Sequence, residues 1–190
     1  MRINDDSDIK IFGEKKKKDD FDPMLLLEEI KRHRSSGNTA KAKTIAHHMA
    51  DSIVKSDIDE SVKSFADRYE VELTSEVMHQ VRVLSVFSAE YVLNKYLPSP
   101  LLSSVAINEL YESILAEAPE FYDRLESGTA FTFYYLAVRS GGNTPAEIGK
   151  AFASQCGRED DGSCALFGTA VFTLNVETFQ NLIFSFNFEE

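Results

Sequence analysis

TSEVMHQVRVLSVFSAEYVLNKYL, residues 74–97, is the stretch of sequence that decides the fold. As an α-helix it presents apolar side chains over most of its circumference, and a helix that is apolar nearly all round is buried. We therefore expect a central helix that other helices surround. Its polar side chains fall in one narrow strip, which contains Glu76, His79, Glu90 and Asn94.

Signals for helix starts flank this central segment on both sides. Asp22 precedes Pro23, and Ser99 precedes Pro100, which is the order of an N-cap residue and a proline in the first helical turn. Between such signals, apolar residues recur at intervals of three and four. The pattern predicts an all-α fold, a single compact bundle of about seven to nine helices over residues 23–190.

Two segments fit a strand as well as a helix. Residues 129–139, TAFTFYYLAVR, are rich in aromatic and β-branched side chains, and residues 184–188, FSFNF, alternate with the period of a strand. Length and context favour a helix for the first segment. A strand or hairpin within residues 171–188 is the alternative to an entirely helical fold.

A hexapeptide occurs twice in nearly the same form, as RSSGNT at 34–39 and as RSGGNT at 139–144. Each copy separates two apolar-periodic segments, and no longer repeat surrounds it, which argues against a solenoid. The glycine suits a left-handed position after a helix, and the threonine can cap the next helix. The repeat predicts two helical hairpins with the same turn residues: Gly37 and Thr39, Gly141 and Thr144.

The 190 residues carry a formal net charge of -11, and most of this charge lies in the second part of the chain. Residues 73–190 contain six Lys and Arg against 15 Asp and Glu, a net charge of -9. A surface of this sign repels nucleic acid and anionic membranes and attracts cationic partners. We therefore expect a protein partner and no nucleic-acid ligand.

The composition predicts neither a disulfide framework nor a membrane anchor. There are two cysteines, and no apolar signal segment follows the first methionine. The Phe-rich stretch 164–188 contains Glu177 and four amide side chains, which make it too polar for a membrane span. Residues 1–22 alternate acidic and basic blocks and predict a flexible tail. We expect a cytoplasmic protein that binds no membrane.

Histidines and carboxylates provide a candidate metal site. Glu76 and His79 have the Glu-x-x-His spacing of carboxylate-bridged di-iron bundles, but this motif occurs only once. His47 and His48 lie on the helix that also carries Asp51, opposite its apolar face, where a solvated surface is the simpler explanation. The hypothetical ligand set is Glu76, His79, His47 and His48, and we predict no cofactor.

The second hexapeptide loop is a candidate anion site. Free backbone N–H groups at a helix N-terminus bind phosphates and carboxylates, and a glycine pair allows close approach. The loop lacks the lysine and the spacing of a phosphate-binding loop, and a turn between two helices needs the same residues. The hypothetical anion site consists of Arg139, Gly141, Gly142, Asn143 and Thr144.

The segment CGREDDGSC, residues 156–164, fits a turn between two helices better than a calcium loop or a redox pair. Its three consecutive acidic residues point apart, and its cysteines do not have the Cys-x-x-Cys spacing. Gly157 can end one helix, and Asp161 or Ser163 can cap the next. We therefore interpret Cys156 and Cys164 as ordinary thiols.

No catalytic motif accompanies these candidates. The sequence lacks Gly-x-Ser-x-Gly, Walker A, His-Glu-x-x-His and protein-kinase motifs, which disfavours several large enzyme classes. The leading hypothesis is a protein-interaction or ligand-binding module that presents acidic or Phe-lined grooves to a partner. The alternatives are a metal-dependent or small-molecule-binding helical enzyme and, third, an acidic inhibitor of a basic toxin or nuclease.

Overall fold

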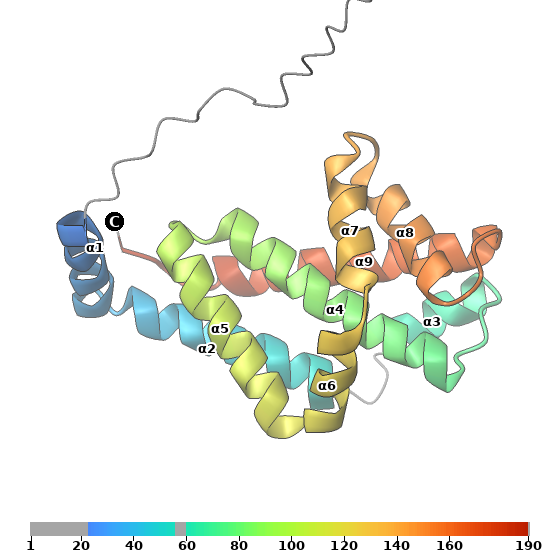
Figure 1. Cartoon of the computed structure of the whole chain (residues 1–190), viewed down its shortest axis with the longest axis horizontal. Coiled ribbons are helices and arrows are strands. Elements are labelled where there is room, and N and C mark those ends of the chain that lie inside the picture. The colour runs from blue at the N-terminus through green and yellow to red at the C-terminus, as the bar shows by residue number, and fades with distance from the viewer. Residues whose placement is uncertain (1–22, 56–59, 190) are drawn as a thin grey trace, which may run out of the picture.

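The computed structural model describes residues 23–55 and 60–189, and these residues form helices and no strand (Figure 1). The all-α prediction is therefore confirmed. The predicted tail at residues 1–22 lies outside the described residues. In chain order the helices are α1 (Pro23–Ser35), α2 (Asn38–Lys55), α3 (Glu60–Arg68), α4 (Ser75–Tyr96), α5 (Pro100–Glu117), α6 (Pro119–Ser127), α7 (Ala130–Arg139), α8 (Thr144–Gln155) and α9 (Gly162–Phe184).

The segment at residues 74–97 forms the long helix α4, as predicted. Thr74 caps its N-terminus, because its hydroxyl accepts a hydrogen bond from the Val77 N–H at 3.3 Å. Side chains such as Val83, Leu84 and Val86 are buried on different sides of the helix. Helices α2, α5, α7, α8 and α9 all contact α4. The apolar circumference therefore makes α4 the helix that most of the other described helices contact.

Two further helix pairs complete the bundle: α2 packs against α5, and α8 packs against α9. Gly149 of α8 lets the second pair approach closely, because a Cβ atom at this position would lie 3.0 Å from the backbone nitrogen of Thr169 in α9. Figure 1 shows α7 in front of α4, with α6 leading to it from the far end of α5. Helices α4, α5, α6 and α7 therefore come together in one region.

The two hexapeptides form the predicted turns, but their threonines do not cap. Gly37 and Gly141 have positive φ angles of 76° and 72°, in the left-handed region that glycine adopts easily. Helix α2 already begins at Asn38, so Thr39 lies inside it. The N-cap of α8 is Asn143, whose side chain makes no capping hydrogen bond, and Thr144 is the first helical residue. The prediction that Thr39 and Thr144 are N-cap residues was wrong, because both helices begin earlier than expected.

The segments that also fitted strands are helical or extended. Residues 130–139 form α7, in which Ala130, Tyr134 and Ala137 are buried at helical intervals, so the helix prediction is confirmed. Helix α9 continues to Phe184, and residues 185–189 form no strand. No helix among the described residues is long and apolar enough to cross a membrane.

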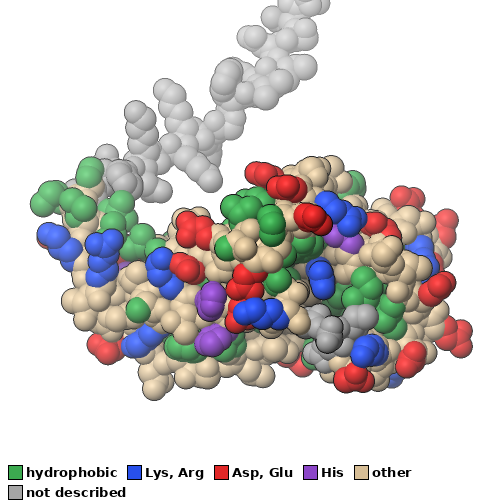
Figure 2. Space-filling view, turned by 90° about the horizontal axis from the view of Figure 1, so that it is seen from below, with side chains coloured by type: hydrophobic (Ala, Val, Ile, Leu, Met, Phe, Trp, Pro, Cys, Tyr) green, Lys and Arg blue, Asp and Glu red, His purple; other side chains and the backbone are tan. Residues whose placement is uncertain are grey.

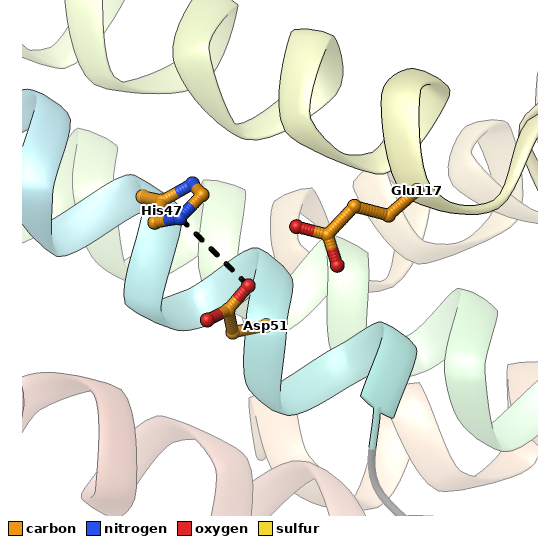
Figure 3. A group of neighbouring side chains, drawn as sticks. All are labelled: His47, Asp51 and Glu117. Atoms are coloured by element: carbon orange, nitrogen blue, oxygen red, sulfur yellow. Dashed lines mark ion pairs between the residues drawn. The ribbon is translucent and has the colours of Figure 1, made fainter.

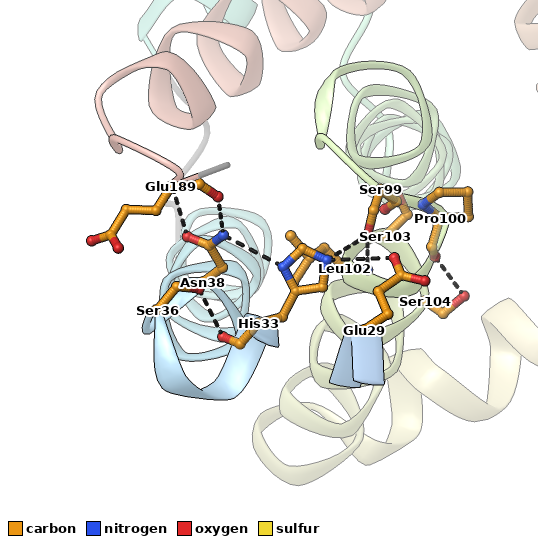
Figure 4. Close-up of polar contacts among 10 residues, drawn as sticks. All are labelled: Glu29, His33, Ser36, Asn38, Ser99, Pro100, Leu102, Ser103, Ser104 and Glu189. Carbon is orange, nitrogen blue, oxygen red and sulfur yellow. Dashed lines mark hydrogen bonds and ion pairs between the residues drawn. The ribbon is translucent and has the colours of Figure 1, made fainter. Parts of the chain in front are cut away.

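The extended residues after α9 are held against the start of α2 (Figure 4). The buried side chain of Asn38 donates a hydrogen bond to the Glu189 carbonyl at 2.6 Å and accepts one from the Glu189 N–H at 3.0 Å. Lys41 adds a hydrogen bond from its Nζ to the Asn187 carbonyl at 2.6 Å. These contacts satisfy the backbone of the last residues, as a second strand would otherwise do. We call this arrangement the Asn38 clamp.

Candidate functional site

The most unusual polar group in the bundle is the carboxylate of Glu90. Glu90 lies in α4 and is half-buried, between the buried Ala89 and the half-buried Tyr91. Each of its oxygens accepts a hydrogen bond from a tyrosine: Oε2 from the Tyr111 hydroxyl at 2.7 Å, and Oε1 from the Tyr135 hydroxyl. No ion pair joins Glu90 to a basic side chain among the described residues. Two neutral donors therefore stabilise this carboxylate where a cation usually would.

Helix packing explains how the two tyrosines reach Glu90. Tyr111 is on α5 and Tyr135 is on α7, and both helices contact α4. Burial raises the pKa of both hydroxyls, and the neighbouring Glu90 raises it further. Both tyrosines are therefore neutral near pH 7, and their hydroxyls donate hydrogen bonds to the carboxylate.

A cavity of about 350 Å³ opens beside Glu90. We call it the Glu90 pocket. Residues of α4, α5, α6 and α7 line it, and among these described residues there is no Lys, Arg or His. The lining consists of Glu90, Tyr111, Tyr122, Leu125, Glu126, Gly128, Phe131 and Tyr135.

Aromatic rings form the walls of the Glu90 pocket in two pairs. The rings of Tyr111 and Tyr122 are nearly perpendicular, at 84°, with centroids 6.3 Å apart. Phe131 and Tyr135 lie 6.5 Å apart at 44°, and Phe87 supports both from the core. Ring faces attract cations within about 6 Å of the centroid, and a carboxylate adds a full negative charge. This combination can bind a cation, and no basic side chain lines the pocket to attract an anion.

The candidate metal residues lie at three separate places. His47 lies near Asp51 on α2 and Glu117 on α5, and one ligand atom from each falls within 4.8 Å of the others (Figure 3). Figure 2 shows histidines beside acidic and basic side chains on the face that α2 and α5 share. His48 points into a different cavity, and Glu76 and His79 lie on α4.

A lysine already neutralises the cluster around His47. The Lys55 Nζ lies 2.8 Å from Asp51 Oδ1 and 3.5 Å from Glu117 Oε2. Its hydrogen bond lowers the pKa of Asp51. His47 Nε2 lies 3.9 Å from Asp51 Oδ1, and its other ring nitrogen, Nδ1, lies 3.3 Å from the Ser113 hydroxyl. A metal ion here would have to displace the Lys55 ammonium, so the arrangement works as an ion-pair network.

The Glu-x-x-His pair has local partners of its own. Glu76 accepts a hydrogen bond from Gln80 at 2.9 Å and lies 3.3 Å from Arg124 of α6. His79 packs edge-to-face on Phe121, with ring centroids 5.7 Å apart, and burial lowers the pKa of its imidazole. Among the described residues, neither belongs to a group of three potential metal ligands. The structure does not bring the four predicted ligands together.

The predicted anion loop lies in the turn between α7 and α8. Gly141, Gly142 and Asn143 are exposed, Thr144 is half-buried, and Arg139 ends α7. Arg139 does not line the Glu90 pocket. Its positive charge acts on Tyr135, where it opposes the rise in the pKa that burial and Glu90 cause. The turn geometry accounts for these glycines, and anion binding at the loop stays a prediction.

The cysteine segment forms the predicted turn. Gly157 takes a φ of 68° after α8, and Asp161 caps α9 by accepting the Cys164 N–H at 3.0 Å. Both thiols are free, Cys164 is buried, and Cys156 is half-buried. The hydrogen bond to Cys164 and burial together raise the pKa of Cys156, so it is not an activated nucleophile.

A larger cavity of about 570 Å³ lies between α2, α3, α4 and α9. It contains His48 and the Asp51–Lys55 ion pair. Among the described residues, neither Arg82 nor His48 has an ion pair. This cavity would suit an anion, which the net charge of this part of the chain repels. The Glu90 pocket has no such conflict and is therefore the stronger candidate.

The chain matches no protein-family model, no curated protein and no solved structure. The site must therefore be interpreted from its chemistry. The sequence pattern placed Glu90 in the polar strip of the central helix, but nothing in the pattern connected Glu90 to the tyrosines. The signal that could have marked Glu90 as a site residue is a carboxylate inside a buried helix, because such a group requires partners from neighbouring helices.

Proposed function

We propose that the protein is a binding module that accepts a cationic side chain of a basic protein partner into the Glu90 pocket. One observation carries this proposal: the half-buried Glu90 carboxylate is surrounded by aromatic rings and has no basic partner among the described residues. A positive charge is the group that this environment lacks.

The chemistry of the pocket supports a cation at the end of an aliphatic chain. Leu125 is buried, Phe131 is half-buried, and both provide apolar surface for the methylene groups of a lysine-like side chain. Glu126, exposed on α6, adds a second carboxylate at the pocket. The apolar surface would contact the stem while Glu90 neutralises the charged end.

The charge of the surrounding chain supports a basic partner. Residues 73–190 contain all the pocket residues and carry a net charge of -9 from 15 acidic and six basic residues. Such a field steers a basic partner toward the surface and accelerates association at low ionic strength. The positive charge of Arg139 acts on Tyr135 and opposes this negative field locally, but Arg139 does not line the pocket.

The other hypotheses gain less support. A metal-dependent enzyme would need ligands that converge, and Lys55 already neutralises the nearest cluster. An acidic inhibitor of a basic toxin or nuclease is a special case of the same binding module. It would differ in the partner, which would then lose an activity on binding.

The test compares three capped pentapeptides that are glycine except for one central residue: lysine, trimethyllysine or norleucine. Binding to the full chain is followed by NMR titration, with the amide of Gly128 as reporter, since this residue lines the pocket. We expect at least one cationic peptide to bind more tightly than the norleucine peptide. Equal binding of all three would refute cation recognition.

The Glu90→Gln variant tests whether the pocket is responsible. It removes one negative charge at nearly constant shape, and we expect binding of the cationic peptide to weaken about tenfold, or about 1.4 kcal/mol. Glu120→Gln is the matched control, because Glu120 is exposed on α6, outside the pocket, and the variant has the same net charge. If both variants weaken binding equally, the effect comes from overall charge and the pocket assignment fails.

A further inference from the structure

The Glu90 pocket combines aromatic ring faces with hydrogen-bond acceptors that are carboxylate and phenol oxygens. A carboxylate has about four lone-pair sites, two on each oxygen, and Tyr111 and Tyr135 each use one. Leu125 and Phe131 offer no acceptor. Beyond Glu90, the acceptors at the wall are the hydroxyl oxygens of Tyr111, Tyr122 and Tyr135 and the exposed carboxylate of Glu126.

Cations differ in the number of N–H donors that they bring to such a wall. A primary ammonium has three N–H donors and a guanidinium has five, and each donor that leaves water needs a new acceptor. A quaternary ammonium has no donor and is only weakly hydrated. It keeps its positive charge, and its methyl groups can pack against ring faces. The ring faces of the pocket therefore suit the cation that can use them without forming new hydrogen bonds.

The arrangement of the walls agrees with this preference. The perpendicular rings of Tyr111 and Tyr122 form one corner, and the tilted rings of Phe131 and Tyr135 form a second. A compact quaternary ammonium group can contact several faces at once in such an enclosure, while Glu90 supplies the counter-charge. The volume of about 350 Å³ leaves room for the methylene stem as well.

We infer that the preferred occupant is a quaternary methylammonium group, and specifically a trimethyllysine side chain of the partner, an inference that rests on the proposed cation binding. A choline headgroup carries the same ammonium and is the other source of this chemistry. Its phosphate, however, lies close to the ammonium and would approach the carboxylates of Glu90 and Glu126. A lysine stem carries no such negative charge, and the acidic surface favours basic protein segments.

The test uses the full chain and four small probes in the same NMR titration: N-acetyl-trimethyllysine amide, N-acetyl-lysine amide, choline, and an uncharged analogue in which tert-butyl replaces trimethylammonium. We expect trimethyllysine to bind about fivefold or more tightly than lysine and also more tightly than the uncharged analogue. Phosphatidylcholine vesicles are tested by co-sedimentation and should not retain the protein.

Two wall variants connect the preference to the rings. Phe131→Leu and Tyr122→Leu each remove one aromatic face, and each should lower the affinity for trimethyllysine about threefold or more while affecting lysine less. Using both guards against one variant failing to fold. Phe184→Leu is the control, because Phe184 is an exposed aromatic residue on α9 outside the pocket.

Each outcome decides between the two proposals. If lysine binds as tightly as trimethyllysine and Glu90→Gln weakens both, the methylammonium inference is overturned and the cation-binding function stands. If the uncharged analogue binds as well as trimethyllysine, the pocket is merely apolar and both proposals fail. Retention by vesicles, or tighter binding of choline than of trimethyllysine, overturns the protein source of the ligand.

Discussion

Gly149 sets the distance between α8 and α9, and replacing it with alanine should destabilise the fold. An alanine Cβ at this position would collide with the Thr169 hydroxyl and the Ala165 carbonyl oxygen, and it would lie 3.0 Å from the Thr169 nitrogen. Two of these three atoms belong to the backbone of α9, so a rotamer change cannot relieve the contact. The helices would have to separate and lose packing.

The magnitude follows from two opposing effects. Alanine gains about 1 kcal/mol over glycine in helix propensity, whereas overpacking costs about 1–3 kcal/mol and sometimes more. Because this clash involves backbone, we expect a net loss of about 2 kcal/mol in the free energy of unfolding. For a chain of this size that lowers the melting temperature by about 4–8 °C, measured by circular dichroism.

The control for this experiment is Gly162→Ala. Gly162 is the first residue of α9, and a Cβ there would meet nothing within 4 Å. We expect this variant to melt within about 2 °C of the wild type. If Gly149→Ala melts at the same temperature as Gly162→Ala, or above it, the argument that close backbone contact fixes the α8–α9 distance is refuted.

Two further predictions concern the histidines. Lys55→Ala should free Asp51 and Glu117, so zinc should raise the melting temperature of this variant by about 3 °C or more but leave the wild type unchanged; no response in the variant would show that these ligands cannot converge on a metal. Burial lowers the pKa of His79 below its usual value of 6.5, so the unfolded chain binds the proton at a higher pH than the folded chain. Stability contributed by neutral His79 is therefore lost as the pH falls through 6.5 toward the folded pKa. The drop in melting temperature between about pH 7.5 and pH 5.5 should be smaller in His79→Gln, and an equal drop would assign the acid sensitivity to other groups.

Local signals predicted the helices well because each depends on neighbours in the sequence. The apolar circumference of residues 74–97 required burial, and Ser99 before Pro100 marked the start of α5. Residues 129–139 were ambiguous because aromatic side chains suit both strands and helices. Tyr134 settles the question in the structure, since it is fully buried together with Ala130 and Ala137 on one side of a helix.

Interactions across the fold could not be predicted in this way. Thr39 fits the local pattern of a helix cap, but α2 begins at Asn38, whose side chain binds Glu189 at the other end of the chain. The tyrosines of the Glu90 pocket come from α5, α6 and α7, and no spacing in the sequence states which helices meet. The Glu-x-x-His spacing predicted metal ligands but not their neighbours in the fold. Arg124 forms an ion pair with Glu76, and Phe121 packs against His79.

The Asn38 clamp also has a consequence for the order in which the chain can fold. It joins residues 151 positions apart, whereas the α1–α2 hairpin is complete after residue 55 (Figure 4). The two hydrogen bonds between Asn38 and Glu189 can therefore form only after the hairpin has been joined by the rest of the fold up to residue 189. Closing so long a loop costs only about 0.6 kcal/mol more for each doubling of its length, which two hydrogen bonds can offset. The clamp is thus a long-range contact that forms late and fastens the segment after α9 to the start of α2.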